Sequence, residues 1–247
     1  MDVELIAHRG GSAIAPENTL AAFSAAIGQK AQAVEFDLQL SADRIPVIIH
    51  DATVNRTTDG KGQVKNQTLQ ELKALDAGAW FGTQFAREQI PTWEEALAIL
   101  RETPLQIYPE VKQAEYWSTA DIDYLVQTLL TQGWQNRCVV ASFNAQFLQQ
   151  VRDRSFEITL GYNVANVSEY TEKMRQAFKS DNSLMLSAYQ LLLNHPQLVE
   201  NARSQGIDVV AWTVDKQENL RQLVELGVVR IVTNSLLDGN STPPKEG

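Results

Sequence analysis

Short apolar runs alternate with amphipathic stretches along most of the chain. Nine runs have the length and composition of strands, at 3–7, 33–38, 46–49, 105–111, 138–142, 158–162, 184–187, 208–214 and 230–233. Between them, apolar residues recur with helical spacing at 19–27, 92–101, 122–132, 145–152, 196–205 and 217–226. Strands and helices that alternate in this way predict a parallel sheet with helical crossovers.

The second and third runs are too close together to be parallel neighbours. Only residues 39–45 separate them, whereas a crossover between parallel strands needs about a dozen residues. The run at 46–49 is therefore expected to fold back antiparallel, as a hairpin on the second strand. The other eight predict a (β/α)8 TIM barrel. An open doubly wound sheet is less favoured, because Gly10 and Gly11 alone make a weak phosphate-binding loop.

The barrel is expected to be a single domain over residues 1–237. Residues 52–91 contain few strand signals and several glycine-rich turns, so they are interpreted as a small cap inserted after the hairpin, over the mouth of the barrel. Residues 238–247 are rich in Gly, Pro and polar residues and predict a flexible C-terminal tail.

Composition restricts the class of protein. The chain has 247 residues, of which 44% are hydrophobic and 21% charged, and its net charge is -9. An acidic protein is a poor partner for nucleic acid, and no run approaches the ~20 apolar residues of a membrane helix. The N-terminus lacks the features of a signal peptide, so a cytoplasmic protein is expected, although a mature secreted form from which the signal peptide has been removed would have the same sequence. The single cysteine, Cys138, lies in an apolar run and is expected to be buried and inert.

Acidic residues lie on two of the predicted strands, near the carboxyl ends where the site of a barrel forms. Glu35 and Asp37 are two residues apart and project to the same side of their strand, as Glu110 and Lys112 do on theirs. Carboxylates that are forced together repel each other. Exposed salt bridges are one explanation for a single pair, but three converging acids favour a divalent cation, Mg²⁺ or Ca²⁺ rather than Zn²⁺.

Two of the three histidines, His8 and His50, also follow predicted strands. A histidine can act as a general acid or base near neutral pH. His195 precedes a proline at a helix start and is interpreted as structural. With a divalent cation, the three acids, Arg9 and Lys112 sum to about +1, which suits a phosphodiester monoanion.

These residues belong to a set of motifs that resembles a known family. The motifs are HRGGSA at 8–13, APENT at 15–19, VEFD at 34–37, PVIIHD at 46–51, NRTT at 55–58, YPEVK at 108–112, SF at 142–143 and WTV at 212–214. Together they extend over nearly the whole chain to about Leu237. They resemble the signatures of the glycerophosphodiester phosphodiesterases.

The resemblance implies a TIM barrel with a small inserted cap. It implies an enzyme that hydrolyses glycerophosphodiesters, such as glycerophosphocholine or glycerophosphoethanolamine, to sn-glycerol 3-phosphate and an alcohol. It leaves open whether water or the adjacent glycerol hydroxyl is the nucleophile. The implied roles are metal binding for Glu35, Asp37 and Glu110, acid/base catalysis for His8 and His50, phosphate binding for Arg9 and Lys112, and contact with the glycerol or alcohol for Trp212, which is equally compatible with the core.

The sequence departs from the family pattern at two places. The family often has Thr-Asp and a nearby proline at the end of the eighth strand, where this chain has Thr233, Asn234 and Ser235. It often has asparagine after the tryptophan motif, where this chain has Asp215. Both places are expected at the rim, with more effect on substrate preference than on activity. Asn18 is a candidate cap of the first helix.

Two alternatives differ in substrate or in chemistry. A lysophospholipase D-type enzyme needs an apolar path for an acyl chain, which Trp80, Phe81 and Phe85 of the cap could line. A barrel that binds a phosphorylated metabolite without turnover is the other alternative, and the presence of both histidines and all three acids argues against it.

Overall fold

The computed structural model describes residues 3–236. Within this range one sheet contains the strands β1 (Glu4–Ala7), β2 (Ala33–Leu40), β3 (Pro46–Ile48), β4 (Gln106–Val111), β5 (Val139–Ser142), β6 (Thr159–Val164), β7 (Ser183–Ala188), β8 (Asp208–Trp212) and β9 (Arg230–Thr233). Their order is β1-β9-β8-β7-β6-β5-β4-β2-β3, and β1 also pairs with β2. This last pairing closes a barrel of parallel strands, with β3 antiparallel on β2. The predicted (β/α)8 barrel and its hairpin are confirmed.

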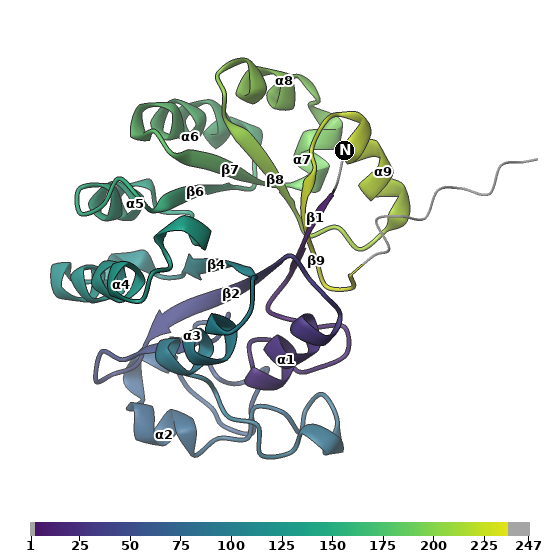
Figure 1. The fold of residues 1–247 in the computed structure, drawn as a ribbon. Helices are drawn as coiled ribbons and strands as arrows, with labels where there is room; N and C mark the ends of the chain where they lie inside the picture. Colours follow the sequence, from purple (N-terminus) through teal and green to yellow (C-terminus); the bar gives the residue numbers. More distant parts are fainter. Residues whose placement is uncertain (1–2, 237–247) are drawn as a thin grey trace, which may run out of the picture.

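Helices surround the barrel (Figure 1). In the described range they are α1 (Leu20–Gly28), α2 (Leu69–Lys73), α3 (Trp93–Arg101), α4 (Thr119–Thr131), α5 (Ala145–Arg152), α6 (Val167–Ser180), α7 (Tyr189–Asn194), α8 (Gln197–Ser204) and α9 (Gln217–Glu225). Short 3₁₀ turns lie at η1 (Val64–Asn66), η2 (Thr83–Phe85), η3 (Ala114–Tyr116) and η4 (Gln135–Arg137). None of the helices in residues 3–236 is long and apolar enough to cross a membrane.

Side chains alternate across each strand, and this alternation separates two apolar layers. On β2, Val34, Phe36 and Leu38 point outward into the large core between strands and helices. Ala33 points inward and joins a smaller core inside the barrel. The remaining members of that inner core are Ile6, Tyr108, Val139, Ala141, Leu184, Leu186, Val210 and Val232. The inner core fills the barrel, so a cavity can form only above it, at the strand ends.

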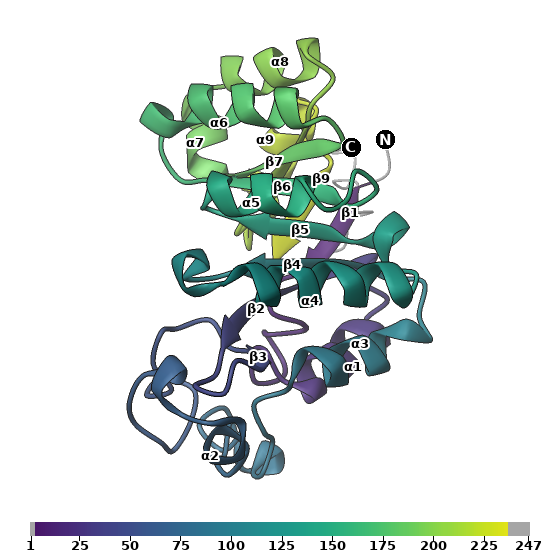
Figure 2. The ribbon, with the colours of Figure 1, turned by 90° about the vertical axis from the view of Figure 1, so that its left-hand side faces the viewer.

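The inserted segment 52–91 packs on the outside of β3. It contains η1, α2 and η2, and α2 lies at the end of the molecule opposite α8 in both ribbon views (Figures 1 and 2). The segment has a small core of its own with β3, formed by Val47, Ile49, Val54, Val64, Leu72, Ala77 and Ile90. The interpretation of residues 1–237 as one domain stays a prediction, and the predicted tail at 238–247 lies outside the described residues.

Two predictions about single residues can be checked against the structure. Cys138 is 2% exposed, and burial raises the pKa of its thiol above the usual value, which agrees with an inert core residue. His195 forms the C-terminal cap of α7 and is not among the residues that line the cavity described below.

Candidate active site

A cavity of about 190 Å³ opens at the carboxyl ends of the strands. It contains all of the site residues predicted from the sequence. Residues 52–91, all of which the structure describes, contribute none of its lining side chains. The lining residues are His8, Arg9, Glu35, Asp37, His50, Glu110, Lys112, Phe143, Asn163, Leu186, Trp212, Thr213 and Val232.

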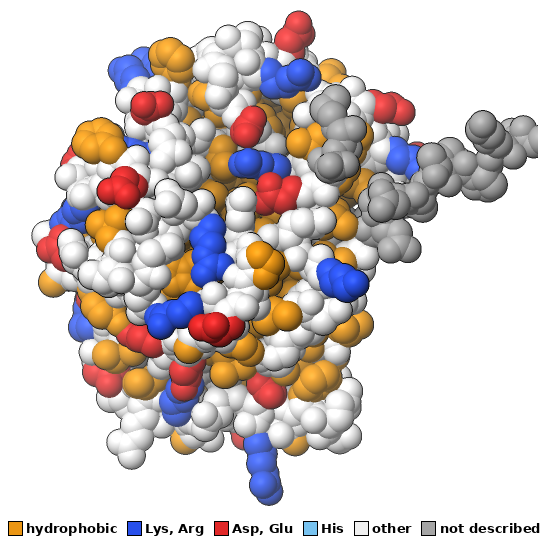
Figure 3. All heavy atoms as spheres, in the orientation of Figure 1, with side chains coloured by type: hydrophobic (Ala, Val, Ile, Leu, Met, Phe, Trp, Pro, Cys, Tyr) orange, Lys and Arg blue, Asp and Glu red, His pale blue; other side chains and the backbone are white. Residues whose placement is uncertain are grey.

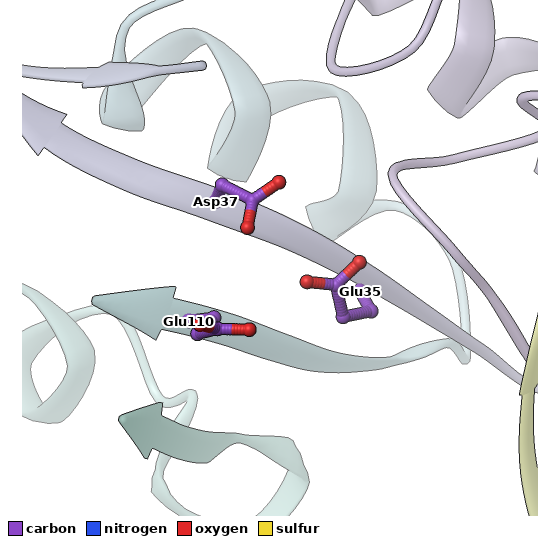
Figure 4. Close-up of side chains that lie close together, drawn as sticks. All are labelled: Glu35, Asp37 and Glu110. Atoms are coloured by element: carbon purple, nitrogen blue, oxygen red, sulfur yellow. The ribbon is translucent and has the colours of Figure 1, made fainter. Parts of the chain in front are cut away.

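The three acids converge because of strand register and side-chain alternation. Asp37 on β2 is the register partner of Glu110 on β4, and Glu35 lies two residues below Asp37 on the same face. One carboxylate oxygen from each lies within 4.8 Å of the others. Figure 4 shows the three carboxylates on one side of the two strands. The predicted cluster is therefore present in space.

The cluster carries strong electrostatic conflict. Burial, together with Asp37 and Glu110, raises the pKa of Glu35 well above its usual value. Burial also raises the pKa of Glu110, and Asp37 adds to the shift. At Asp37 burial acts in the same direction, but Lys112 and Arg9 outweigh it and hold the pKa below its usual value. One acid is thus stabilised as a carboxylate by the cations, and the other two are not fully compensated.

This donor set fits a divalent cation that prefers oxygen. Three inward-facing carboxylates share one small volume with no histidine or thiol among the clustered donor atoms in residues 3–236. Such a set is typical of Mg²⁺ or Ca²⁺ sites. Lys112 Nζ lies 3.2 Å from Asp37 Oδ1 and 2.6 Å from Glu110 Oε1, so it neutralises part of the cluster on the side toward β4.

The turn after β1 brings Arg9 over the cluster. Arg9 has a left-handed backbone (φ +57°), and its N–H donates to Glu35 Oε2 at 2.9 Å. Gly10 follows with φ +83°, and a Cβ at this position would lie 2.7 Å from the backbone of Ala22 in α1. Only glycine fits this close approach. The His-Arg-Gly motif therefore sets the turn that fixes Arg9 beside the acids.

The Arg9 side chain is tied to two acids. Its Nη1 donates to Glu17 Oε1 at 2.7 Å, and its Nε lies 3.4 Å from Asp37 Oδ2. Its Nε is buried and makes no hydrogen bond. Burial opposes the charge of Arg9, but Asp37 and Glu17 outweigh this effect and raise its pKa above the usual value. Arg9 is thus a fixed cation in the cavity wall.

Asn18 supports the acid cluster and does not cap α1, so that expectation is wrong. Thr19 is the N-cap, and its hydroxyl accepts from the Ala22 N–H. Asn18 Nδ2 donates to Asp37 Oδ2 at 2.8 Å, and the Asp37 N–H donates to Asn18 Oδ1 at 3.2 Å. The two residues compete for the same cap in the sequence, and threonine at the position before the helix takes it.

His8 projects from the end of β1 between the acid cluster and β9. Its Nδ1 lies 2.6 Å from Asn234 Oδ1, and its Nε2 lies 3.9 Å from Glu35 Oε2. Burial and the neighbouring charge of Arg9 lower the pKa of His8 to about 4. His8 is therefore a neutral imidazole at neutral pH and can accept a proton.

His50 is held by a chain of charged residues. Its Nδ1 lies 2.7 Å from Asp51 Oδ1. Arg56 donates to both oxygens of Asp51, through Nε at 2.8 Å and Nη2 at 3.0 Å. Arg56 also donates to both oxygens of Glu17 at 2.8 Å. Arg9 and His50 are thereby connected through Glu17, Arg56 and Asp51.

An aromatic pair forms the opposite wall of the cavity. Trp212, at the end of β8, packs edge-on against Phe143, with ring centroids 6.0 Å apart. Trp212 also contacts the inner core. Trp212 therefore both packs on the core and lines the cavity, as the two interpretations from the sequence allowed. The aromatic residues Trp80, Phe81 and Phe85 of the insertion contact one another instead, with centroid separations of 5.6 Å, and line no part of the cavity.

The departures at Asn234 and Asp215 are not confined to the rim, so this expectation is wrong. Asn234 contacts His8, as described above, and Asp215 accepts from Asn234 through its Nδ2 at 2.7 Å and its N–H at 2.8 Å. The ends of β8 and β9 bring the two residues together. Sequence reasoning also missed Glu17, Asn18 and Arg56 as site residues, although the motifs that carried the resemblance include all of these.

The fold and the site are typical of a barrel enzyme, because a polar cavity with buried acids and two imidazoles lies at the carboxyl ends of the parallel strands. Comparisons with known proteins identify the family. Residues 8–237 match the sequence profile of the Glycerophosphoryl diester phosphodiesterase family. The chain therefore belongs to this family and is an enzyme, a phosphodiesterase, as predicted.

Individual relatives agree along nearly the whole chain. A glycerophosphodiester phosphodiesterase of Caldanaerobacter subterraneus is 34% identical over 236 residues, which cover 95% of each chain. An Oleispira antarctica phosphodiesterase, solved in complex with the product sn-glycerol-3-phosphate, is 33% identical with a TM-score of 0.85, covering 94% of this chain and 92% of that one. A glycerophosphodiester phosphodiesterase from Agrobacterium tumefaciens is 25% identical with a TM-score of 0.77, covering 94% and 96%.

Proposed function

We propose that this enzyme hydrolyses glycerophosphodiesters of small polar alcohols, such as glycerophosphocholine and glycerophosphoethanolamine, to sn-glycerol 3-phosphate and the alcohol. The observation that carries the proposal is the cavity in which two imidazoles, two fixed cations and three clustered carboxylates meet. The product named for the Oleispira antarctica phosphodiesterase supports the same choice of substrate.

Arg9 and Lys112 are the phosphate-binding residues of the proposal. Both line the cavity, and each is held in place by ion pairs, Arg9 with Glu17 and Lys112 with Glu110. Arginine presents a planar fork to phosphate oxygens, and lysine adds a point charge. Because their acid partners already fix both cations, little ordering is left when the substrate arrives.

Glu35, Asp37 and Glu110 would hold one divalent cation, Mg²⁺ or Ca²⁺. When bound, the cation would supply Lewis-acid polarisation of the phosphoryl group and positive charge to stabilise the transition state. Burial and mutual repulsion raise the pKa values of Glu35 and Glu110, and a bound cation would offset both effects. Asn18 keeps Asp37 in orientation for this role through its two hydrogen bonds.

His8 and His50 are the acid/base pair. Each has its Nδ1 atom engaged by an oxygen, of Asn234 and Asp51 respectively, so that Nε2 is the atom left for proton transfer. One histidine takes the proton of the nucleophile as its oxygen bonds to phosphorus. The other gives a proton to the alcohol oxygen as the bond from that oxygen to phosphorus breaks.

Two nucleophiles are consistent with this arrangement, water and the glycerol hydroxyl next to the phosphoester. A substrate analogue with hydrogen in place of that hydroxyl separates them. Turnover of the analogue at a rate close to that of the natural substrate identifies water. Loss of turnover with unchanged binding identifies the hydroxyl, which would form a cyclic phosphate before hydrolysis.

The assay that tests the proposal supplies Mg²⁺ or Ca²⁺ and compares glycerophosphocholine, glycerophosphoethanolamine and lysophosphatidylcholine, with detection of glycerol 3-phosphate and free choline. We expect glycerol 3-phosphate from the first two, loss of turnover in EDTA and recovery with the cation. Faster release of choline from lysophosphatidylcholine than from glycerophosphocholine would instead identify a lysophospholipase D. The position of Trp80, Phe81 and Phe85 outside the cavity argues against that outcome.

A further inference from the structure

We propose that Asp215 and Asn234 form a positioning pair that fixes His8 in the tautomer with the proton on Nδ1 and directs its Nε2 toward the acid cluster. The three residues lie at the ends of β8, β9 and β1, which are neighbours in the barrel. The inference deepens the proposed function and rests on it, because it assigns a purpose to Asn234, which contacts His8, and to Asp215, which contacts Asn234. Neither residue lines the cavity.

Asp215 accepts hydrogen bonds from residues at the end of β9. The backbone N–H of Asn234 donates to Asp215 Oδ1 at 2.8 Å, and the hydroxyl of Thr233 lies 3.1 Å from the same oxygen. A backbone N–H can only donate, so this side chain is engaged as an acceptor. Its second oxygen, Oδ2, lies 2.7 Å from the side-chain amide of Asn234.

A carboxylate at that position dictates which way the Asn234 amide points. The amide has a donor end and an acceptor end, and hydrogen-bond partners decide between the two orientations. An acceptor at 2.7 Å requires the NH₂ end, so Oδ1 must face the other way, toward His8. The hydroxyl of Ser12 at 3.1 Å is a second donor for this Oδ1 and supports the same orientation.

The orientation of Asn234 then decides the tautomer of His8. An amide oxygen 2.6 Å from Nδ1 can only accept, so Nδ1 carries the proton. Nε2 is left with its lone pair, on the side of the ring toward Glu35. If the amide were reversed, its oxygen would meet Asp215 Oδ2 and its NH₂ group would face Nδ1 of His8. The proton of His8 would then have to move to Nε2, and this atom could no longer accept a proton.

Asp215 therefore acts on His8 through Asn234. Exchanging the side chains of Asp215 and Asn234 tests this role. In Asp215→Asn the acceptor at Oδ2 is replaced by an amide that can turn either end toward Asn234. In the double variant Asp215→Asn, Asn234→Asp, the new carboxylate faces His8 and can only accept from Nδ1. The exchange keeps one acid and one amide in the pair, so the total charge is that of the natural protein.

The experiment combines ¹⁵N NMR of the histidine rings at neutral pH with steady-state kinetics in the presence of a divalent cation. The His8 signals are identified by their loss in His8→Gln. We expect the Nδ1–H pattern in the natural protein. In Asp215→Asn we expect a shift toward the Nε2–H pattern, with kcat about tenfold to a hundredfold lower and KM little changed. In the double variant both the Nδ1–H pattern and kcat should recover.

A matched control is Asp208→Asn, which removes a carboxylate at the exposed start of the same strand, β8. It should leave the His8 pattern and kcat as they are. Thermal unfolding of each variant separates a loss of folding from a loss of positioning. An Nε2–H pattern in the natural protein, or an unchanged pattern and kcat in Asp215→Asn, would overturn the inference. Full turnover by His8→Ala, with the NMR result as expected, would instead refute the catalytic role of His8.

Discussion

Asn18 and Asp37 bind each other twice, with the amide of Asn18 donating to the Asp37 carboxylate and accepting from the Asp37 backbone N–H. This contact ties the loop before α1 to the strand that carries two of the three acids. Asn18 has a left-handed backbone with φ +59°, a conformation that asparagine tolerates better than most residues. The loop can therefore bring an amide to the buried face of β2, where Asp37 is only 1% exposed.

Replacing Asn18 with alanine should weaken divalent-cation binding. The change leaves Asp37 without one donor and with only its contacts to Lys112 and Arg9 to orient the carboxylate. Loss of such a supporting contact typically costs about 10- to 100-fold in affinity or activity. The measurement is the concentration of Mg²⁺ or Ca²⁺ that gives half-maximal turnover. Asn201→Ala, an exposed asparagine on α8, is the matched control and should bind the cation as the natural protein does. Equal half-maximal concentrations in all three proteins would contradict the supporting role.

The histidines offer a three-way comparison within one chain. His8→Ala and His50→Ala should each lower kcat by about 10²-fold or more, because each removes a group that transfers a proton in the transition state. His195→Ala removes an imidazole outside the cavity, at the end of α7, and should leave kcat unchanged. Steady-state kinetics with glycerophosphocholine provide the measurement. Unchanged turnover in both cavity variants would reject the acid/base assignment.

Much of the architecture could be predicted because it depends on the local pattern of apolar and polar residues in the sequence. All nine strands correspond to predicted apolar runs, and the short 39–45 connection predicted the antiparallel β3. The two-residue spacing of Glu35 and Asp37 predicted a shared face. These features need only strand alternation and connection length. The helix α6 was not predicted, because it buries few apolar residues, chiefly Tyr170 and Ala177, in a mostly polar sequence.

The missed parts of the site depend on contacts between distant segments. Arg56 reads as a surface residue of the insertion, and only the folded chain brings it to Glu17, which lies 39 residues earlier. Asn234 and Asp215 were expected at the rim because each lies beyond the end of its strand. Their mutual contact arises because β8 pairs with β9. The hydrogen bond between Asn234 and His8, 226 residues away, arises because β9 pairs with β1. No local spacing encodes these pairings.

Replacing Arg56 with alanine should reduce turnover through His50. Arg56 holds both oxygens of Asp51, which in turn binds His50, so its loss lets the imidazole rotate. We expect kcat to fall about tenfold, less than in His50→Ala, because supporting contacts are worth less than the group they orient. Arg175→Ala on the exposed face of α6 removes a comparable charge and is the control. A loss as large as that of His50→Ala would show that Arg56 acts on more than the His50 orientation.

Divalent cations should raise the free energy of unfolding of the protein, and the variant Glu35→Gln should show much less of this increase. At a cation concentration of about 100 times Kd, binding adds about 2.7 kcal/mol to the free energy of unfolding. For a protein of this size that raises Tm by about 5–10 °C. Glu35→Gln removes one of the three ligands and should abolish most of this increase. Calorimetry with and without EDTA measures both effects.

In EDTA the substitution Glu35→Gln should instead increase the stability of the protein, and the size of this increase should depend on pH. Burial and the neighbouring acids raise the pKa of Glu35 in the folded protein above the usual value of 4.5. The folded state therefore binds this proton more tightly than the unfolded state does, and the stability gained from it is full below pH 4.5 and is lost as pH rises through the folded pKa. Glutamine stays neutral and avoids that loss. Glu35→Gln should thus be more stable than the natural protein in EDTA at neutral pH, by a margin that shrinks toward pH 4.5. A margin that grows as pH falls would contradict the sign of the shift and, with it, the crowding of acids that favours a bound cation.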